Sequence, residues 1–137
     1  MKGQCIAVVS GKGGTGKTSL TAGVGTALAQ SGRSVLCVDC DIGLRNLDLA
    51  LGLTDRALMD FSDVALKRCS LESAVVSHPN VPNLYLLTAP VRMRGPAVTT
   101  LDFRLMLGKI RQQFDYCLLD APAGLGEGFR LAVCAAD

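Results

Sequence analysis

The chain has 137 residues, of which 49% are hydrophobic, and it carries a formal net charge of +2 at pH 7. This length suits one domain with a largely buried core, and balanced charge with 4% aromatic content and no Trp argues against a surface dedicated to nucleic acid. No apolar stretch approaches the roughly 20 residues of a membrane-spanning helix, and six scattered cysteines indicate reduced, buried thiols.

The first predicted element is a β-strand over residues 5–10, an apolar run that ends where a glycine-rich segment begins. That segment, residues 11–18, reads Gly-Lys-Gly-Gly-Thr-Gly-Lys-Thr and fits the phosphate-binding pattern G-x-x-x-x-G-K-[ST]. From Gly16 a helical pattern takes over, and Gly32 lies just past its end. The apolar residues on one face of this helix are Leu20, Val24, Ala27 and Leu28. The order strand, glycine loop, helix is what the motif requires and predicts nucleotide binding.

The chemistry of the glycine loop follows from its residue types. Glycines carry no Cβ, so successive backbone N–H groups can close around phosphate oxygens, and the positive end of the following helix adds to the attraction. We expect Lys17 to neutralise the β- and γ-phosphates and the Thr18 hydroxyl to coordinate Mg²⁺. The residues predicted to bind the nucleotide are Gly11, Lys12, Gly13, Gly14, Thr15, Gly16, Lys17, Thr18 and Ser19.

The rest of the chain alternates between strands and helices. Near-continuous apolar runs predict buried strands at residues 34–39, 84–88 and 116–120. Helical patterns cover residues 57–67, 71–76, 100–114 and 129–136. This alternation predicts a doubly wound α/β fold, with a mainly parallel sheet and helices on both faces. Because the last helix would lead into a further strand, residues 1–137 are expected to form the N-terminal part of a P-loop ATPase domain that is incomplete at its C-terminus.

Cys37 and Cys40 formally make a C-x-x-C pattern at the end of the second predicted strand. Side chains alternate between the two faces of a strand, so these two sulfurs should point apart. A metal site would also need a second pair of ligands, and none is evident in the sequence. We therefore predict that both are buried structural thiols.

Three aspartates lie at the ends of predicted strands. Asp120 ends the last strand and is followed by Pro122 and Gly124, which is the form of a Walker B aspartate. Asp39 and Asp41 end the second strand, at the same carboxyl edge of the sheet where ligands of open α/β folds bind. Phosphoryl transfer needs carboxylates that hold Mg²⁺ and orient the attacking water, so this edge is predicted to be a catalytic centre.

Three segments resemble motifs of one known family. Residues 12–18 resemble the deviant Walker A motif of the ParA/MinD ATPases, whose extra lysine, here Lys12, is the mark of the family. Residues 39–49, Asp-Cys-Asp-Ile-Gly-Leu-Arg-Asn-Leu-Asp-Leu, resemble the switch I region of the branch that selects the division site. Residues 120–124 resemble the Walker B and switch II motifs of the same branch. The resemblance covers the whole chain, which is about half of a typical family member.

The resemblance implies a Mg²⁺-dependent ATPase that binds ATP and dimerises face to face, with both nucleotides at the interface. Lys12 would reach the phosphates of the partner subunit, while Lys17 would hold phosphates within its own subunit. Asp41 would position the hydrolytic water, which makes these three the implied catalytic residues. The implied magnesium ligands are Thr18, Asp39 and Asp120, with the two aspartates acting through water.

The same resemblance implies a cellular role. The ATP-bound dimer would attach from the cytoplasm to the inner face of the cell membrane, through a C-terminal amphipathic helix that this chain lacks. It would recruit a MinC-like division inhibitor until a MinE-like protein stimulates hydrolysis, and so position the septum. Three alternatives stay open: a ParA-type partition ATPase that binds DNA, which switch I disfavours, a metallocluster carrier, and a truncated ATPase without activity.

Overall fold

The computed structural model describes residues 3–9, 17–41, 46–53, 59–90, 98–121 and 130. Its strands are β1 (Gln4–Val8), β2 (Val35–Asp39), β3 (Val76–Ser77), β4 (Leu84–Leu87) and β5 (Tyr116–Asp120). Its helices are α1 (Lys17–Gln30), α2 (Asn46–Ala50), α3 (Phe61–Ala65), α4 (Leu71–Ala74) and α5 (Thr100–Gln113). The helix predicted over residues 129–136 lies outside the described residues, except for Arg130, which is helical.

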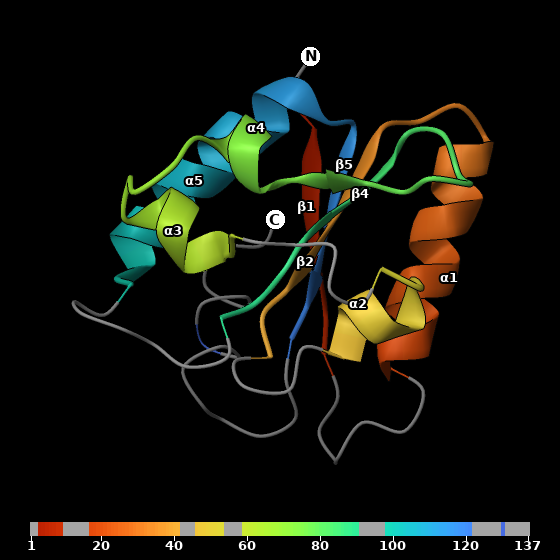
Figure 1. Ribbon diagram of the computed structural model, residues 1–137, viewed down its shortest axis with the longest axis horizontal. Helices are drawn as coiled ribbons and strands as arrows, with labels where there is room; N and C mark the ends of the chain where they lie inside the picture. Colours follow the sequence, from red (N-terminus) through yellow and green to blue (C-terminus); the bar gives the residue numbers. More distant parts are fainter. Residues whose placement is uncertain are drawn as a thin grey trace.

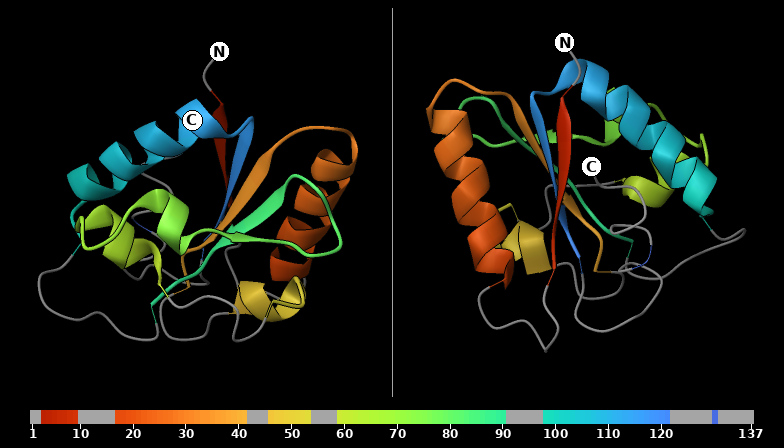
Figure 2. Two further views of the ribbon diagram at one scale, coloured as in Figure 1. Left: turned by 45° about the horizontal axis from the view of Figure 1, so that its top comes forward. Right: turned by 180° about the vertical axis from the view of Figure 1, so that it is seen from behind.

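The strands form one sheet in the order β1-β5-β2-β4-β3 (Figure 1). β1, β5, β2 and β4 are parallel, whereas the short edge strand β3 pairs antiparallel with β4. α1 and α2 lie on one face of the sheet and α3, α4 and α5 on the other, as the two views of Figure 2 show. The predicted doubly wound, mainly parallel α/β fold is therefore confirmed. None of the helices in the described part of the chain is long and apolar enough to span a membrane.

Each face of the sheet carries its own hydrophobic core, and β2 contributes to both. All five residues of β2 are buried. Leu36 and Val38 pack in the cluster beneath α5, whereas Val35 and Cys37 pack in the cluster beneath α1. Cys40 belongs to the α5 cluster, so Cys37 and Cys40 lie on opposite faces as predicted. Burial on both faces explains why this strand reads as a continuous apolar run.

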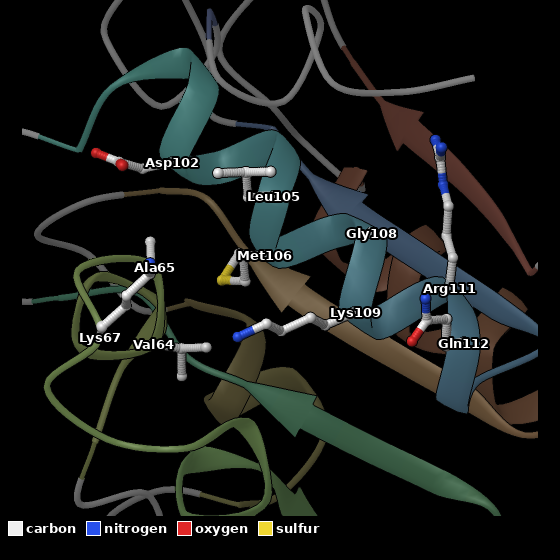
Figure 3. A pocket seen from close by; sticks show the side chains of 10 residues that line it. All are labelled: Val64, Ala65, Lys67, Asp102, Leu105, Met106, Gly108, Lys109, Arg111 and Gln112. Atoms are coloured by element: carbon white, nitrogen blue, oxygen red, sulfur yellow. The ribbon is translucent and has the colours of Figure 1, made fainter.

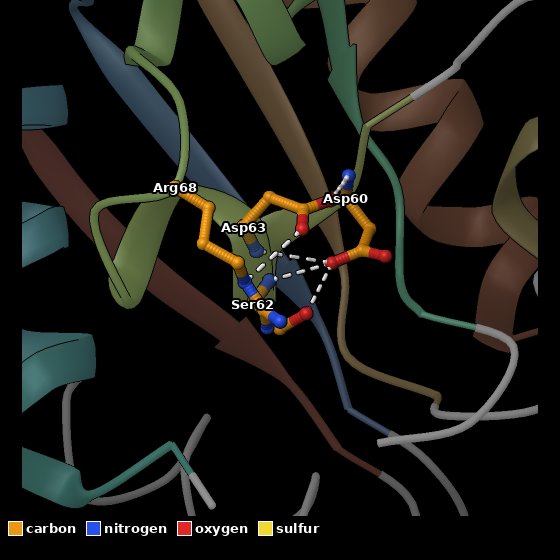
Figure 4. Close-up of polar contacts among 4 residues, drawn as sticks. All are labelled: Asp60, Ser62, Asp63 and Arg68. Atoms are coloured by element: carbon orange, nitrogen blue, oxygen red, sulfur yellow. Dashed lines mark hydrogen bonds and ion pairs between the residues drawn. The ribbon is translucent and has the colours of Figure 1, made fainter. Parts of the chain in front are cut away.

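Helix α3 begins at a capping box rather than at the predicted residue 57. Asp60 is extended and bridges to Thr88, and its carboxylate accepts the backbone N–H groups of Ser62 and Asp63 at 2.9 and 3.2 Å (Figure 4). In return, the Asp63 carboxylate accepts the backbone N–H of Asp60 at 3.0 Å, and it also forms an ion pair with Arg68 at 3.4 Å. The described part of the predicted segment is therefore helical only over Phe61–Ala65, because the bridge to Thr88 keeps Asp60 in an extended conformation.

Two further helices of the structure also differ from what the sequence predicted. The helix expected over residues 71–76 ends at Ala74, and Val76 instead pairs with Leu86 of β4 because this edge offers its backbone a partner. Helix α2 was not predicted, since a five-residue helix carries too little periodicity to recognise. The predicted helix at residues 100–114 is confirmed as α5, except that Phe114 is extended and caps its C-terminus.

The packing of α1 differs from what its apolar pattern indicated. Leu20 and Val24 are 58% and 41% exposed, and of the four apolar residues only Leu28 packs against the core. The buried residues of α1 are instead small: Thr21, Ala22, Gly25 and Ala29. Small side chains let the helix axis approach the sheet closely, so that a Cβ added to Gly25 would lie only 2.7 Å from the Cys37 sulfur.

This close approach gives a test of the packing of α1. Gly25→Ala is expected to destabilise the protein by about 1–3 kcal/mol through overpacking, although alanine alone favours helices by about 1 kcal/mol. Gly23→Ala is the matched control, because a Cβ at Gly23 meets nothing within 4 Å and should be neutral or stabilising. Urea unfolding of the two variants measures the difference. If Gly25→Ala stabilised the protein as much as Gly23→Ala does, the close packing of α1 on β2 would be contradicted.

Candidate functional site

The parallel strands bring two predicted site residues together at the carboxyl edge of the sheet. In the strand register Asp120 is paired with Asp39 of β2 on one side and with Val8 of β1 on the other. Both aspartates are fully buried. β1 leads toward the predicted phosphate loop, and α1, which follows that loop, packs against β2 and β5. Asp120 therefore lies beside the end of β1, and Asp39 lies next to it on β2.

The first turns of α1 are joined to the end of β5 by hydroxyl groups. Thr18 Oγ1 donates a hydrogen bond to Asp120 Oδ2 at 2.9 Å, and Thr21 Oγ1 donates to Asp120 Oδ1 at 3.3 Å. A hydroxyl that gives its proton to a carboxylate keeps its oxygen lone pairs available for a cation. Thr21 was not predicted as a site residue. The available signal was its position three residues after Thr18, which places a polar side chain on the same helix face.

Asp39 organises the segment that follows β2. Its carboxylate accepts the backbone N–H of Asp41 at 2.9 Å and that of Leu47 in α2 at 3.3 Å. The pKa of Asp39 is raised from 3.8 to about 7, chiefly by burial and also by the charges of Asp120 and Asp41, against the opposing effect of the two hydrogen bonds. Asp41 is only partly buried. Asp39 thus positions Asp41 through the backbone.

The raised pKa of Asp39 predicts a specific pH dependence of stability. The folded state holds this proton up to about pH 7, whereas the unfolded state releases it near 3.8, so the contribution is fully present below pH 3.8 and is lost as pH rises through 7. The loss is at most about 4 kcal/mol. Urea unfolding between pH 5 and 8 should therefore show a falling contribution that is absent in Asp39→Asn. The same slope in both proteins would contradict this assignment.

Most of the predicted phosphate loop lies outside the described residues. These residues are Gly11, Lys12, Gly13, Gly14, Thr15 and Gly16. Lys17 is the first residue of α1, followed by Thr18, which is partly buried, and Ser19, which is exposed. Their roles in binding phosphate stay predictions.

The oxygen ligands of the site suit magnesium. The part of the chain that the structure describes contains no group of three or more His, Cys, Asp or Glu side chains that could hold a metal ion by itself. Mg²⁺ prefers oxygen ligands and is usually held by one or two protein groups together with substrate phosphates and waters. The Thr18 hydroxyl, with Asp120 directly behind it, fits this manner of binding.

Comparisons with known proteins give a consistent family. A sequence profile of the AAA domain matches residues 3–137. The septum site-determining protein MinD of Synechocystis sp. is 43% identical over 132 residues, which are 96% of this chain and 50% of that protein. The chain spans about half the length of the curated relatives it matches.

Solved structures give the same result. The MinC:MinD cell division protein complex of Aquifex aeolicus matches with a TM-score of 0.85 at 42% identity, covering 98% of this chain and 53% of that one. MinD of Pyrococcus horikoshii, complexed with Mg-ADP, matches with a TM-score of 0.81 at 33% identity, covering 97% and 54%.

Proposed function

Because the chain belongs to the ParA/MinD family of AAA-domain ATPases, we propose that it binds and hydrolyses ATP as a switch of the septum-site-determining kind. The observation that carries this proposal is the bond from Thr18 to Asp120, which joins the helix after the phosphate loop to the Walker B strand. A P-loop ATPase needs this connection, because the hydroxyl and the carboxylate hold one magnesium site between them.

Different residues of the chain bind the phosphates and the metal in this proposal. The glycine loop cradles the phosphates with its N–H groups, and Lys17 at the start of α1 neutralises their charge. The Thr18 hydroxyl is the direct ligand of the metal, with Asp120 and Asp39 acting through water. When bound, Mg²⁺ supplies neutralisation of the negative charge that develops on the transferred phosphoryl group.

Asp41 is proposed to position the water that attacks the γ-phosphate. Its backbone is fixed by the hydrogen bond to Asp39, and its side chain is partly exposed at the strand edge. A general base must be within hydrogen-bond reach of the proton it removes, or reach it through one water. A second hydrogen bond joins the Asp39 carboxylate to the backbone of α2. A change at the γ-phosphate could therefore move Asp41 and α2 together.

At the level of the cell, the γ-phosphate would bias an equilibrium between monomer and dimer. Dimerisation pairs two weak membrane anchors into one firm attachment to the inner membrane surface. MinD of Aquifex aeolicus forms a complex with MinC, which supports a MinC-like partner for this protein. A MinE-like activator would then release the dimer by stimulating hydrolysis, and the protein would cycle between cytoplasm and membrane.

The dimer switch is tested by replacing Lys12 in the full-length protein. Lys12→Ala should retain ATP binding but lose dimerisation and at least about a hundredfold in hydrolysis, because the lysine acts across the interface like an arginine finger. Analytical ultracentrifugation with a non-hydrolysable ATP analogue measures the dimer. Arg33→Ala, which removes an exposed cation in the turn after α1, is the matched control. Normal dimerisation and turnover of Lys12→Ala would refute the role across the interface.

A further inference from the structure

A second cavity lies between α3 and α5, and none of its lining residues belongs to the predicted nucleotide site (Figure 3). Its volume is about 470 Å³, within the range of about 300–1,000 Å³ that is typical of small-molecule sites. Its apolar walls come from two helices and from residues that the sequence analysis did not single out as functional. They are Val64 and Ala65 of α3 and Leu105 and Met106 of α5.

A glycine inside α5 keeps one side of this cavity open. Gly108 lies in the interior of the helix, where glycine costs roughly 0.5–1 kcal/mol relative to alanine. A Cβ at this position would meet nothing within 4 Å, so close packing in the described structure does not require a glycine. Gly108 does line the cavity, and its missing side chain leaves that space free.

Two lysines bring positive charge to the cavity from opposite sides. Lys109 extends from α5 toward Val64 of α3 (Figure 3). Lys67 lies two residues after the end of α3 and has a φ of 62°, a left-handed conformation that residues with a Cβ seldom adopt. Within the described part of the chain, neither ammonium group makes a hydrogen bond or ion pair. Both charges are therefore available to a ligand.

The other charged residues around the cavity are engaged elsewhere. Asp102 accepts the backbone N–H of Thr99 at 3.2 Å and completes the capping box at the start of α5. Arg111 turns toward the sheet, where its Nε donates to the Cys5 sulfur at 3.2 Å. Asp102 keeps its negative charge, but Lys67, Lys109 and Arg111 outnumber it among the lining residues, so the cavity carries a positive surplus beside an apolar wall.

We propose that this cavity binds a small organic anion with an apolar body, such as a medium-chain carboxylate. The anionic head pairs with Lys67 and Lys109, and the apolar body packs on Met106, Leu105 and Val64 across the opening that Gly108 leaves. Removing the apolar body from water gives affinity, while the two ammonium groups select for negative charge. The proposal is independent of the function proposed above.

The probe for the test is decanoate, titrated calorimetrically into the protein, with the neutral analogue decanol for comparison. We expect saturable binding of decanoate that is at least about tenfold tighter than that of decanol. Lys109→Gln and Lys67→Gln should each weaken decanoate binding by about fivefold or more. Gly108→Leu should weaken the binding by about fivefold or more, because it puts a larger side chain among the lining residues, with open space at its Cβ.

The control is Arg33→Gln, which removes an exposed cation far from the cavity and should leave decanoate affinity unchanged. Circular dichroism melting checks that Gly108→Leu is folded, and the two lysine variants test the site even if it is not. No saturable binding of decanoate, equal affinity for decanol, or equal affinity in both lysine variants and the wild type would each overturn the proposal. Binding of an acidic peptide with an apolar anchor, without any binding of decanoate, would also overturn it in favour of a protein partner.

Discussion

Lys17→Ala in the full-length protein is expected to abolish ATP binding and turnover. The lysine is the first residue of α1, and in the proposed site its charge would add to that of the positive end of the helix. Two or more charge-assisted bonds to phosphate are lost at once, which predicts at least about a hundredfold weaker binding and about a thousandfold slower turnover. Fluorescence of an ATP analogue measures binding, and release of inorganic phosphate measures turnover.

Lys12→Ala is the internal comparison for this experiment, because it removes the same charge from the same loop. We expect it to retain ATP binding within a few-fold, since in the proposed dimer the Lys12 ammonium would act on the partner subunit's nucleotide. If Lys17→Ala bound ATP as well as Lys12→Ala does, the glycine segment would not be a phosphate-binding loop. Unfolding curves of both variants in the absence of nucleotide should match that of the wild type.

Asp120→Asn is expected to remove magnesium-dependent hydrolysis while preserving the fold. The amide has the same shape and can still accept one hydroxyl, but it carries no charge and turns an NH₂ group toward Thr18 or Thr21. We predict a loss of about a hundredfold to a thousandfold in kcat, and loss of the gain in ATP affinity that Mg²⁺ gives. Because the charge of Asp120 also raises the pKa of Asp39, the pH dependence of stability should become shallower.

Thr21→Val is the matched control for Asp120→Asn. It keeps the shape of a fully buried side chain and removes the hydroxyl that donates to Asp120 Oδ1. Thr21 bonds the carboxylate oxygen that Thr18 does not bond, so turnover should fall by no more than about tenfold. A Thr21→Val variant as inactive as Asp120→Asn would mean that the carboxylate acts mainly by fixing α1 on the sheet.

The central strands were predicted closely because burial on both faces gives each of them a continuous apolar run in the sequence. β5 has the predicted bounds, β2 and β4 each differ from prediction at one end, and β1 is Gln4–Val8 where residues 5–10 were predicted. The short edge strand β3 was not predicted. The helices were predicted less well. Asp60 lies within the segment predicted as a helix, residues 57–67. It is nevertheless held extended by its bridge to Thr88, a contact between residues far apart in sequence. Leu20 and Val24 gave α1 its apolar pattern, although the helix packs through its small residues.

The sequence predicted that Asp39 and Asp120 lie at the same edge of the sheet, but not the hydrogen bonds that join them to α1 and α2. Glycine spacing in the loop and aspartates at strand ends are local signals, and they identified Thr18, Asp39 and Asp120 individually. The sequence could not say that Asp120 accepts hydroxyls from both Thr18 and Thr21, or that Asp39 also binds the backbone of α2.

The sequence alone determined the α/β class, the position of the phosphate-binding motif and the family resemblance. Each depends on residues within one short segment, where φ/ψ preferences, glycine content and side-chain alternation act locally. The tertiary structure decided which strand ends lie side by side, which face of α1 is buried, and that α3 and α5 enclose a cavity. These features depend on contacts such as that of Thr18 with Asp120, 102 residues apart, which form only when strand register and helix packing are satisfied together.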